Sequence, residues 1–317
     1  MARQLRIEYP GAFYHVTSRG NQKQPVFLSS WDRARFLDYL DEAHEKFDAL
    51  VHSYCLMENH YHLMLETRQA NLSKIMHFMN TSFTIYLNKR HKRVGHLFQG
   101  RFKAILIEAE TYAQELSRYI HLNPLRAGIV KRPEDHAWSS LREYLGQRKP
   151  PRWLDTSFVL GLFGDNPDDA RLQYAAFISS LLIPTVPNPF KNKNGGSPAI
   201  LGSKGFLERI KETYLQEKAP NREFPLLRQY REKPPLGRIW SEVVRRLGNE
   251  DKLSRNMAIF LTHGHTDYRL EEIGEYFGIS QAAIGMACLR IKQVLSQNPD
   301  LSRAVEEIKR NLFNRTK

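Results

Sequence analysis

The sequence predicts an α+β fold followed by an all-helical region, and three observations lead to this prediction. Short β-favouring runs alternate with longer amphipathic segments over residues 1–148. A segment rich in Pro, Gly and Asn follows between residues 183 and 205. Beyond it, apolar residues recur at helical spacing. We therefore expect a sheet-containing domain at 1–148, a helical extension and linker at 149–205, and an all-helical domain at 206–317.

The elements of the first domain can be assigned in order. Strands are expected where apolar and β-branched residues dominate, at 12–18, 50–57, 61–66 and 104–108. Helices are expected where apolar residues recur every three or four positions, at 31–47, 72–90 and 112–123. Ser30 and Asn71 are expected to cap the first two helices, and Pro124 to end the third. This order predicts a ferredoxin-like antiparallel sheet with its helices on one face.

The chain is strongly basic, with a net charge of +13 and a pI near 9.7. Residues 1–150 carry 22 basic and 15 acidic side chains, and the remainder carries 25 and 19. This balance is not typical of an enzyme acting on small molecules. Because both halves are positive, it favours two contact surfaces for a polyanion over a single basic tail.

The two cysteines and the N-terminus predict where the protein acts. Cys55 and Cys288 match no metal or redox spacing, so we expect reduced core residues in a cytosolic protein. We see no signal peptide at the N-terminus and no apolar run long enough for a membrane span. We therefore expect a cytoplasmic, nucleoid-associated protein with no membrane partner.

A histidine pair is the first candidate for chemistry. His60 and His62 lie two apart on an expected strand, so both rings project from the same face. Two imidazoles on one strand can hold a divalent metal and leave positions open for a phosphate oxygen. Judged by spacing alone, two nearby histidines are more often ordinary surface or half-buried residues than metal ligands.

A tyrosine lies on the last helix expected in this domain. Tyr119 and Asn123 are four residues apart and share a helical face. A tyrosine hydroxyl attacks poorly unless its phenolate is stabilised, which a nearby metal would do. Asn123 would offer a carbonyl oxygen to that metal, and His121 is the competing third ligand. The alternative is that Tyr119 is a core aromatic and Asn123 a residue of the helix end.

Cations and aromatics alternate in one stretch between the second helix and the fourth strand. Cations contact phosphates, and aromatic rings stack on unpaired bases. The candidate DNA contacts there are Lys89, Arg90, Lys92, Arg93, Phe98, Arg101 and Lys103. Arg19, Asn21 and Lys23 in the first turn are further candidates. A solvated loop is the alternative for this stretch.

Several ordered motifs carry a resemblance to a known family. They are FYHVTSRGNQKQPVF at 13–27, LMENHYHLMLE at 56–66, GHLFQGRFKAI at 95–105, YIHLNPLRAGIV at 119–130 and WSSLREY at 138–144. Together they resemble the single-tyrosine HUH transposases, most closely the REP-associated tyrosine transposase group. The resemblance implies a ferredoxin-like fold, single-stranded or hairpin DNA as substrate, and Mg²⁺ or Mn²⁺ as cofactor.

The resemblance also implies roles for individual residues. His60 and His62 become metal ligands, Tyr119 the nucleophile that forms a 5′-phosphotyrosine link, and Asn123 the third ligand. Many relatives have Gln at the position of Asn123. Glu58 lies where many relatives have proline.

The C-terminal part contains a helix-turn-helix pattern. An apolar helix from Leu270, a glycine at Gly278 and a second helix from Ser280 fit this motif. The recognition helix would place Ser280, Gln281, Ala282, Arg290 and Lys292 against a DNA duplex. Residues 225–312 resemble the duplex-binding domain of the bacterial replication initiator DnaA. His263 and His265 repeat the two-apart spacing, and we expect them in a loop outside any metal site.

The function expected from these features is that of a metal-dependent DNA strand transferase with an appended duplex-binding domain, acting as a monomer or homodimer. Two alternatives stay open. One is a DNA-binding regulator or structural protein with an idle nuclease site. The other is a metal-dependent nuclease that uses water instead of Tyr119.

Overall fold

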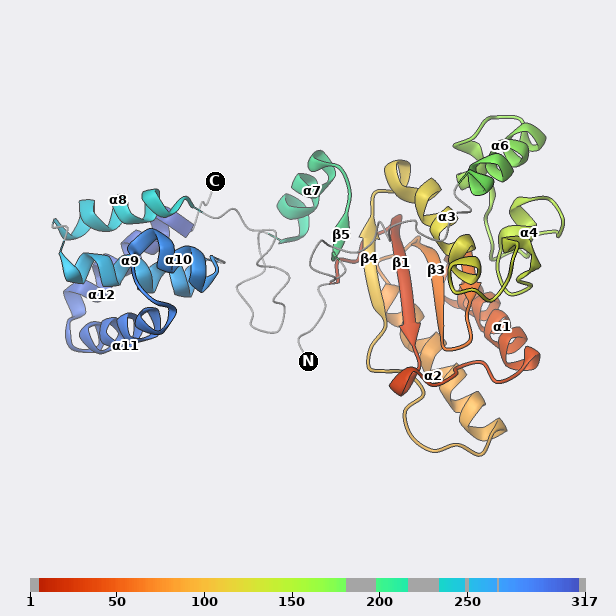
Figure 1. The fold of residues 1–317 in the computed structure, drawn as a ribbon, viewed down its shortest axis with the longest axis horizontal. Coiled ribbons are helices and arrows are strands. Elements are labelled where there is room, and N and C mark those ends of the chain that lie inside the picture. The colour runs from red at the N-terminus through yellow and green to blue at the C-terminus, as the bar shows by residue number, and fades with distance from the viewer. Residues whose placement is uncertain (1–5, 181–197, 216–233, 249–250, 267, 314–317) are drawn as a thin grey trace. The chain divides into compact units, whose positions relative to one another are not determined.

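The computed structural model describes residues 6–180, 198–215, 234–248, 251–266 and 268–313 (Figure 1). They fall into two compact units, an N-terminal one within residues 4–218 and a C-terminal one within residues 219–317. No helix of the described residues is both long and apolar enough to cross a membrane.

The N-terminal unit is built on a five-stranded sheet in the order β2-β3-β1-β4-β5. The strands are β1 (Ala12–Arg19), β2 (Ala49–Leu56), β3 (His60–Thr67), β4 (Lys103–Ile107) and β5 (Ile200–Leu201). The predicted α+β class is confirmed, and the four predicted strands lie within two residues of their expected bounds. β5 was not predicted. It pairs with β4 in parallel, so the sheet is mixed and not purely antiparallel.

β5 comes from the end of the segment that was predicted to be a linker. The rest of that segment, residues 183–197, lies outside the described residues. Backbone N–H groups of Leu106 and Glu108 donate to the carbonyls of Ala199 and Leu201, both at 2.9 Å. The Glu108 carboxylate also accepts from the backbone N–H of Ser203 at 2.7 Å. These bonds hold this part of the segment against the sheet edge.

Helices cover both faces of the sheet, which corrects the expectation of one covered face. Tyr61 packs against Phe36 of α1 (Ser30–Phe47) and donates to Asn80 of α2 (Leu72–Arg90). The next residue, His62, faces Tyr119 of α3 (Ala109–Arg126). Successive side chains on a strand point to opposite faces. Thus α1 and α2 lie on one face and α3 on the other (Figure 1).

Three predicted helix ends were wrong. α3 begins at Ala109, three residues before the expected start at residue 112. α3 passes through Pro124 to Arg126, because the N–H groups of Ala127 and Ile129 bond the carbonyls of Asn123 and Pro124 and keep the turn after the proline. A proline this near the end of a helix costs only one backbone bond. The cap of α1 is Ser29, one residue before the expected Ser30, and its hydroxyl accepts from the N–H of Asp32.

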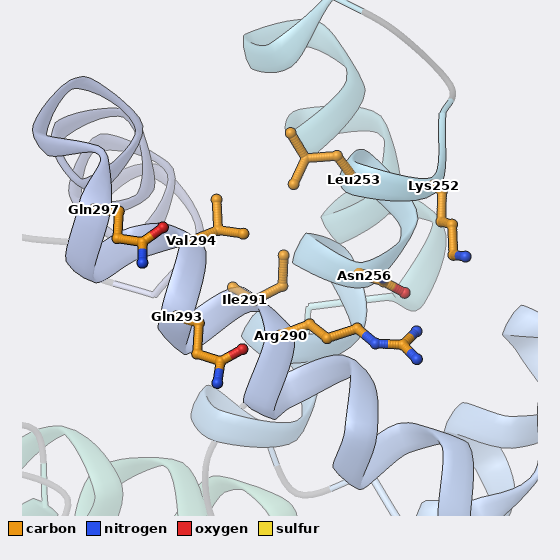
Figure 2. Close-up of a pocket in the computed structure, with 8 residues that line it drawn as sticks. All are labelled: Lys252, Leu253, Asn256, Arg290, Ile291, Gln293, Val294 and Gln297. Carbon is orange, nitrogen blue, oxygen red and sulfur yellow. The ribbon is translucent and has the colours of Figure 1, made fainter.

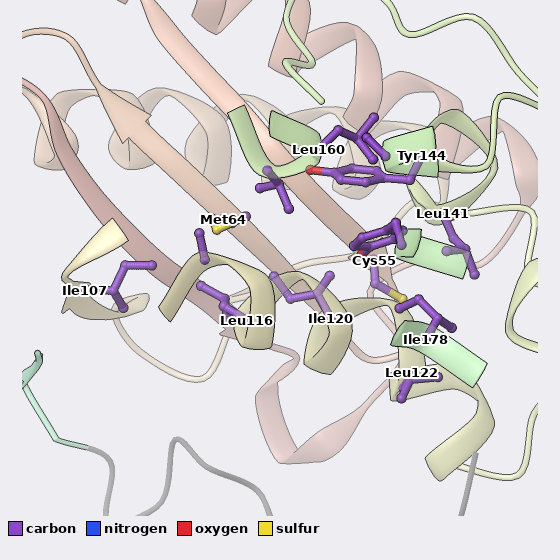
Figure 3. Close-up of a cluster of buried hydrophobic side chains, with 14 of the residues drawn as sticks. Cys55, Met64, Ile107, Leu116, Ile120, Leu122, Leu141, Tyr144, Leu160 and Ile178 are labelled. Atoms are coloured by element: carbon purple, nitrogen blue, oxygen red, sulfur yellow. The ribbon is translucent and has the colours of Figure 1, made fainter. Parts of the chain in front are cut away.

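α3 is fixed by a buried apolar cluster between the sheet and three short helices. Sheet residues such as Met64 and Ile107 meet Leu116 and Ile120 of α3 (Figure 3). The opposite side of the cluster is supplied by α4 (Leu141–Tyr144), α5 (Ser157–Gly161) and α6 (Pro167–Ser179). α3 is thereby held on the sheet, and the position of Tyr119 follows from this packing. The unit is completed by α7 (Lys204–Ile210) and the π-helical turn Lys211–Leu215.

The described part of the C-terminal unit is helical, as predicted. Its helices are α8 (Leu236–Leu247), α9 (Lys252–His265), α10 (Leu270–Phe277), α11 (Gln281–Gln297) and α12 (Pro299–Phe313). α10 ends at Gly278 in the left-handed conformation, and Ser280 caps α11. His263 and His265 lie in the last turn of α9, so their expected loop location was wrong. Residues two apart on a helix are rotated by about 200° around its axis, so the side chains of His263 and His265 point in different directions.

Candidate active site and nucleic-acid interface

The histidine pair lies on the sheet face that α3 covers. His60 and His62 have ring centroids 5.0 Å apart and an interplanar angle of 76°. His60 is half-buried at the start of β3, whereas His62 is 6% exposed. The strand therefore presents two imidazoles side by side, as its alternation predicts.

A third histidine, His15 of β1, joins the pair and was not singled out from the sequence. Its Nε2 lies 2.9 Å from Nδ1 of His62, and the two rings are stacked. The antiparallel register, which pairs Thr17 with His62, places His15 one pair further along the same face. The sequence predicts only that AFYHVTS forms a strand, and it does not give the register of that strand against β3.

Burial keeps all three imidazoles neutral at neutral pH. It lowers the pKa of His15 to about 3 and that of His60 to about 4, in the second case with help from the charge of Arg19. Burial lowers the pKa of His62 well below its usual value, and the charges of His15, His60 and Arg126 add to this. A neutral imidazole is the form that binds a metal.

Tyr119 meets this cluster edge-on from α3. Its ring centroid lies 5.7 Å from that of His62 and 5.7 Å from that of His15, at interplanar angles of 84° and 77°. The guanidinium of Arg126, two turns further along α3, lies 5.0 Å from the centre of the Tyr119 ring. Arg126 was also missed from the sequence, although its spacing of seven residues from Tyr119 on a helix was a usable signal.

Asn123 and His121, the two candidates for the third ligand, differ in their hydrogen bonds. Asn123 donates from Nδ2 to the carbonyl of Tyr119 at 2.8 Å, so its Oδ1 is the amide atom that this bond does not use. His121 is fully buried, with Nδ1 2.7 Å from the hydroxyl of Tyr174 and Nε2 2.7 Å from the hydroxyl of Ser140. Both ring nitrogens of His121 are therefore engaged, and neither is left for a metal in this arrangement.

The donor set fits a divalent cation that accepts nitrogen and oxygen. His60 and His62 offer neutral imidazole nitrogens, and Asn123 offers an amide oxygen. Among the residues that the structure describes, no group of three His, Cys, Asp or Glu side chains is arranged to hold a metal ion. Asn123 would add a third protein ligand of another kind, an amide oxygen.

Three cationic side chains lie on the sheet face of the histidines or on α3, which covers it. Arg19 pairs with His60 across β1 and β3, and Lys103 pairs with Thr17, the residue that also pairs with His62. Both side chains are exposed. With Arg126 they place positive charge around the histidines, where the phosphates of a strand would be neutralised.

The other predicted DNA contacts of this domain lie outside β1, β3, β4 and α3, the elements that carry the histidines, Tyr119 and the three cations. Asn21 and Lys23 are in the turn after β1, where the carbonyl of Lys23 accepts from Asn59 at 3.0 Å. Lys89 and Arg90 end α2, the helix of the opposite sheet face, and Lys92 and Arg93 follow it. Arg101 is exposed just before β4.

Phe98 is the predicted DNA contact that the structure does not support as a stacking platform. It is 8% exposed and packs edge-on against Tyr61, with 6.1 Å between ring centroids. A base cannot stack on a ring that is covered by the core. The sequence pattern of alternating cations and aromatics did not distinguish a buried anchor from an exposed platform.

In the C-terminal unit the predicted recognition residues are exposed at the surface. Gln281, Ala282, Arg290 and Lys292 all belong to α11, and the hydroxyl of Ser280 caps it by accepting from the N–H of Ala283. Arg290 also lines a groove between α9 and α11 with polar neighbours (Figure 2). These neighbours are Lys252, Asn256, Gln293 and Gln297.

Comparison with known proteins bears on the N-terminal unit. The family model described as Transposase IS200 like matches residues 9–123. The chain is also similar to the structure of a REP-associated tyrosine transposase bound to a REP hairpin, with a TM-score of 0.42 and 16% identity over 49% of this chain and 93% of that one. No curated protein matches the chain.

The family match defines residues 9–123 as a transposase domain, which is an enzyme domain. More narrowly, it is of the IS200-like type. The matched segment contains the histidine pair and Tyr119, and it ends at Asn123.

Proposed function

We propose that this protein is a metal-dependent DNA strand transferase that cleaves and rejoins single-stranded or hairpin DNA through Tyr119. The observation that carries the proposal is the edge contact of Tyr119 with His62, 5.7 Å between ring centroids, on a sheet face bordered by cations. A core tyrosine would need neither the neutral histidines nor the neighbouring charges.

Each side chain has a definable task in the reaction. The Tyr119 oxygen attacks the scissile phosphorus, so that a tyrosine–phosphorus bond forms and the bond from phosphorus to the 3′ oxygen breaks. The phenolic proton leaves, and the departing 3′ oxygen takes up a proton to become a hydroxyl. Attack by a 3′-hydroxyl on the phosphotyrosine reverses these changes and joins a strand, so no nucleotide cofactor is consumed.

The charges around the site support this chemistry. Arg126 faces Tyr119, and its positive charge stabilises a developing phenolate and the phosphate that approaches it. Arg19 and Lys103 would hold the strand on either side. His60, His62 and Asn123 would hold a Mg²⁺ or Mn²⁺ ion, whose contribution when bound is to withdraw charge from a phosphoryl oxygen.

The C-terminal unit is proposed to bind duplex DNA through its helix-turn-helix. The order of α10, a turn at Gly278 and α11 supports this proposal, as do the exposed leading residues of α11. A duplex anchor on the same chain as the strand-cutting domain raises the local concentration of the substrate.

The test uses hairpin DNA labelled at the 5′ or 3′ end, with Mn²⁺, resolved on a denaturing protein gel. Hairpins that flank the gene are the natural library. We expect a covalent adduct carrying the 3′ label, because the 5′-phosphate of the downstream fragment stays on the protein. Tyr119→Phe is expected to abolish the adduct and to leave DNA binding intact. Tyr112→Phe on the same helix is the matched control and is expected to keep it.

The other outcomes separate the alternatives. Cleavage without an adduct would replace the proposal by a nuclease that uses water. Binding of the hairpins with no cleavage in any divalent metal would replace it by a DNA-binding regulator.

A further inference from the structure

Both histidines proposed as metal ligands have Nδ1 engaged by a neighbouring side chain. In His60 this atom lies 2.7 Å from Oδ1 of Asn59. In His62 it lies 2.9 Å from Nε2 of His15. In each ring the other nitrogen, Nε2, is the one left for a ligand.

The proton position on His60 follows from the partner of Asn59. The amide nitrogen of Asn59 donates to the carbonyl of Lys23 at 3.0 Å, and a carbonyl can only accept. This bond fixes which end of the amide is nitrogen, so the oxygen is the end that faces His60. An amide oxygen cannot donate, and therefore Nδ1 of His60 carries the proton. Nε2 of a neutral His60 then carries the lone pair that a metal requires.

The turn that carries the Lys23 carbonyl has an unusual backbone. Gln22 and Lys23 both have positive φ, at 51° and 62°. Non-glycine residues adopt this region at a cost, and such costs gather at functional sites. Here the turn aims a carbonyl at Asn59, and the N–H of Gly20 bonds the carbonyl of Asn59 at 2.8 Å. Two hydrogen bonds thus connect the turn after β1 to the turn before β3.

His15 is placed to do the same for His62. For His62 to bind through Nε2, its proton must be on Nδ1, which then donates to Nε2 of His15. Metal-binding histidines usually donate their second N–H to such a partner, which fixes both the ring and the proton. His15 is 4% exposed, so its ring is held by the core.

We propose that Asn59 is a positioning residue that locks His60 in the Nδ1–H form, and that His15 does the same for His62. This inference deepens the proposed function. The role of the fixed proton positions, which is to prepare both rings for a metal, rests on that function. The lock itself is a property of the metal-free protein. It is therefore open to measurement whether or not a metal binds.

The test is a long-range ¹H–¹⁵N correlation spectrum of the full-length, metal-free protein at neutral pH. It distinguishes the two neutral forms of each histidine, and the signals are assigned by their loss in His60→Gln and His62→Gln. We expect His60 in the Nδ1–H form in the unaltered protein. In Asn59→Ala it should return to the Nε2–H form that free imidazole prefers. Asn59→Asp keeps an acceptor and should keep the Nδ1–H form, and Gln99→Ala in a nearby loop is the matched control.

His15→Phe tests the second half with the same spectrum. It should release His62 from the Nδ1–H form and leave His60 unchanged. In parallel, Mn²⁺ alone is titrated into each protein. If the proposed function holds, Asn59→Ala and His15→Phe should each weaken Mn²⁺ binding by about 10- to 100-fold.

The outcomes separate the two proposals. An Nε2–H signal for His60 in the unaltered protein, or no change in Asn59→Ala, would overturn the lock of His60; the same results for His62 and His15→Phe would overturn the second. The expected spectra with no Mn²⁺ binding would support the lock and would instead contradict the metal-dependent function.

Discussion

The guanidinium of Arg126 lies 5.0 Å from the centre of the Tyr119 ring, on the same face of α3 and two turns further along. Its charge also contributes to the lowered pKa of His62. One cation therefore acts on both the candidate nucleophile and a candidate ligand.

Replacing Arg126 by Ala should slow adduct formation by roughly 100-fold, which is the typical loss when one charge-stabilising donor is removed from a site. Arg126→Lys keeps the charge and should recover part of the rate. The measurement is the time course of the labelled adduct. Arg132→Ala removes an exposed arginine paired with Asp135 and should leave the time course unchanged. Equal rates for Arg126→Ala and the unaltered protein would remove Arg126 from the site.

The stability of the N-terminal unit should fall in mild acid because of His121. Burial lowers the pKa of His121 from 6.5 to about 3, so between these values the unfolded chain binds a proton that the folded protein does not. Stability is then lost as the pH falls below 6.5, by up to about 1.4 kcal/mol per pH unit for each such histidine. Urea unfolding at pH 7, 6 and 5 measures this. His121→Gln should make the dependence less steep by one such contribution, leaving those of His15, His60 and His62, whereas His77→Gln, at an exposed position of α2, should not change it.

Lys103 should contribute to strand binding through phosphate contact. Lys103→Ala should weaken binding of single-stranded DNA and lower the salt dependence of log K by about 0.7, the value for one phosphate contact. Titrations at several salt concentrations, monitored by fluorescence anisotropy, measure both quantities. Lys74→Ala, at an exposed position of α2 on the opposite face, is the control. An unchanged slope in Lys103→Ala would place the strand away from β4.

Gly274 of α10 and Gly285 of α11 should respond oppositely to replacement by alanine. A Cβ on Gly274 would lie 2.7 Å from the carbonyl oxygen of Ile279, so Gly274→Ala should force the turn apart and destabilise the unit. A Cβ on Gly285 of α11 would meet nothing within 4 Å, so Gly285→Ala should stabilise the unit by up to about 1 kcal/mol. Thermal unfolding of the two variants checks this. A stable Gly274→Ala protein would contradict the turn geometry.

Local patterns predicted most of the fold. The largely apolar run YHLMLE and the amphipathic spacing of residues 72–90 gave the strand and the helix correctly, because each depends only on neighbouring residues. The path of α3 through Pro124 and the pairing of β5 with β4 were missed. The first depends on bonds made beyond the proline, and the second on contacts between segments about 95 residues apart.

The same division holds for the candidate site. His60, His62 and Tyr119 were picked out by spacing, and the structure brings them together; their roles remain predictions. His15 was missed because only the register of β1 against β3 brings it to His62. Phe98 was misread because a sequence does not show which side of a loop faces the core. Arg126 was missed because helical spacing was applied only from Tyr119 to Asn123 and not one turn further.

The pairing of β5 with β4 bears on how this protein can be divided. The family match ends at residue 123 and the wider resemblance near residue 148, which would suggest a minimal fragment of that length. Such a fragment would lose Tyr174, a partner of His121, and would expose the unpaired backbone groups along β4. Uncovered strand edges recruit other chains. We therefore expect a fragment that ends at residue 123 or 148 to aggregate and to be poorly soluble. A fragment that ends after residue 215 should be monodisperse.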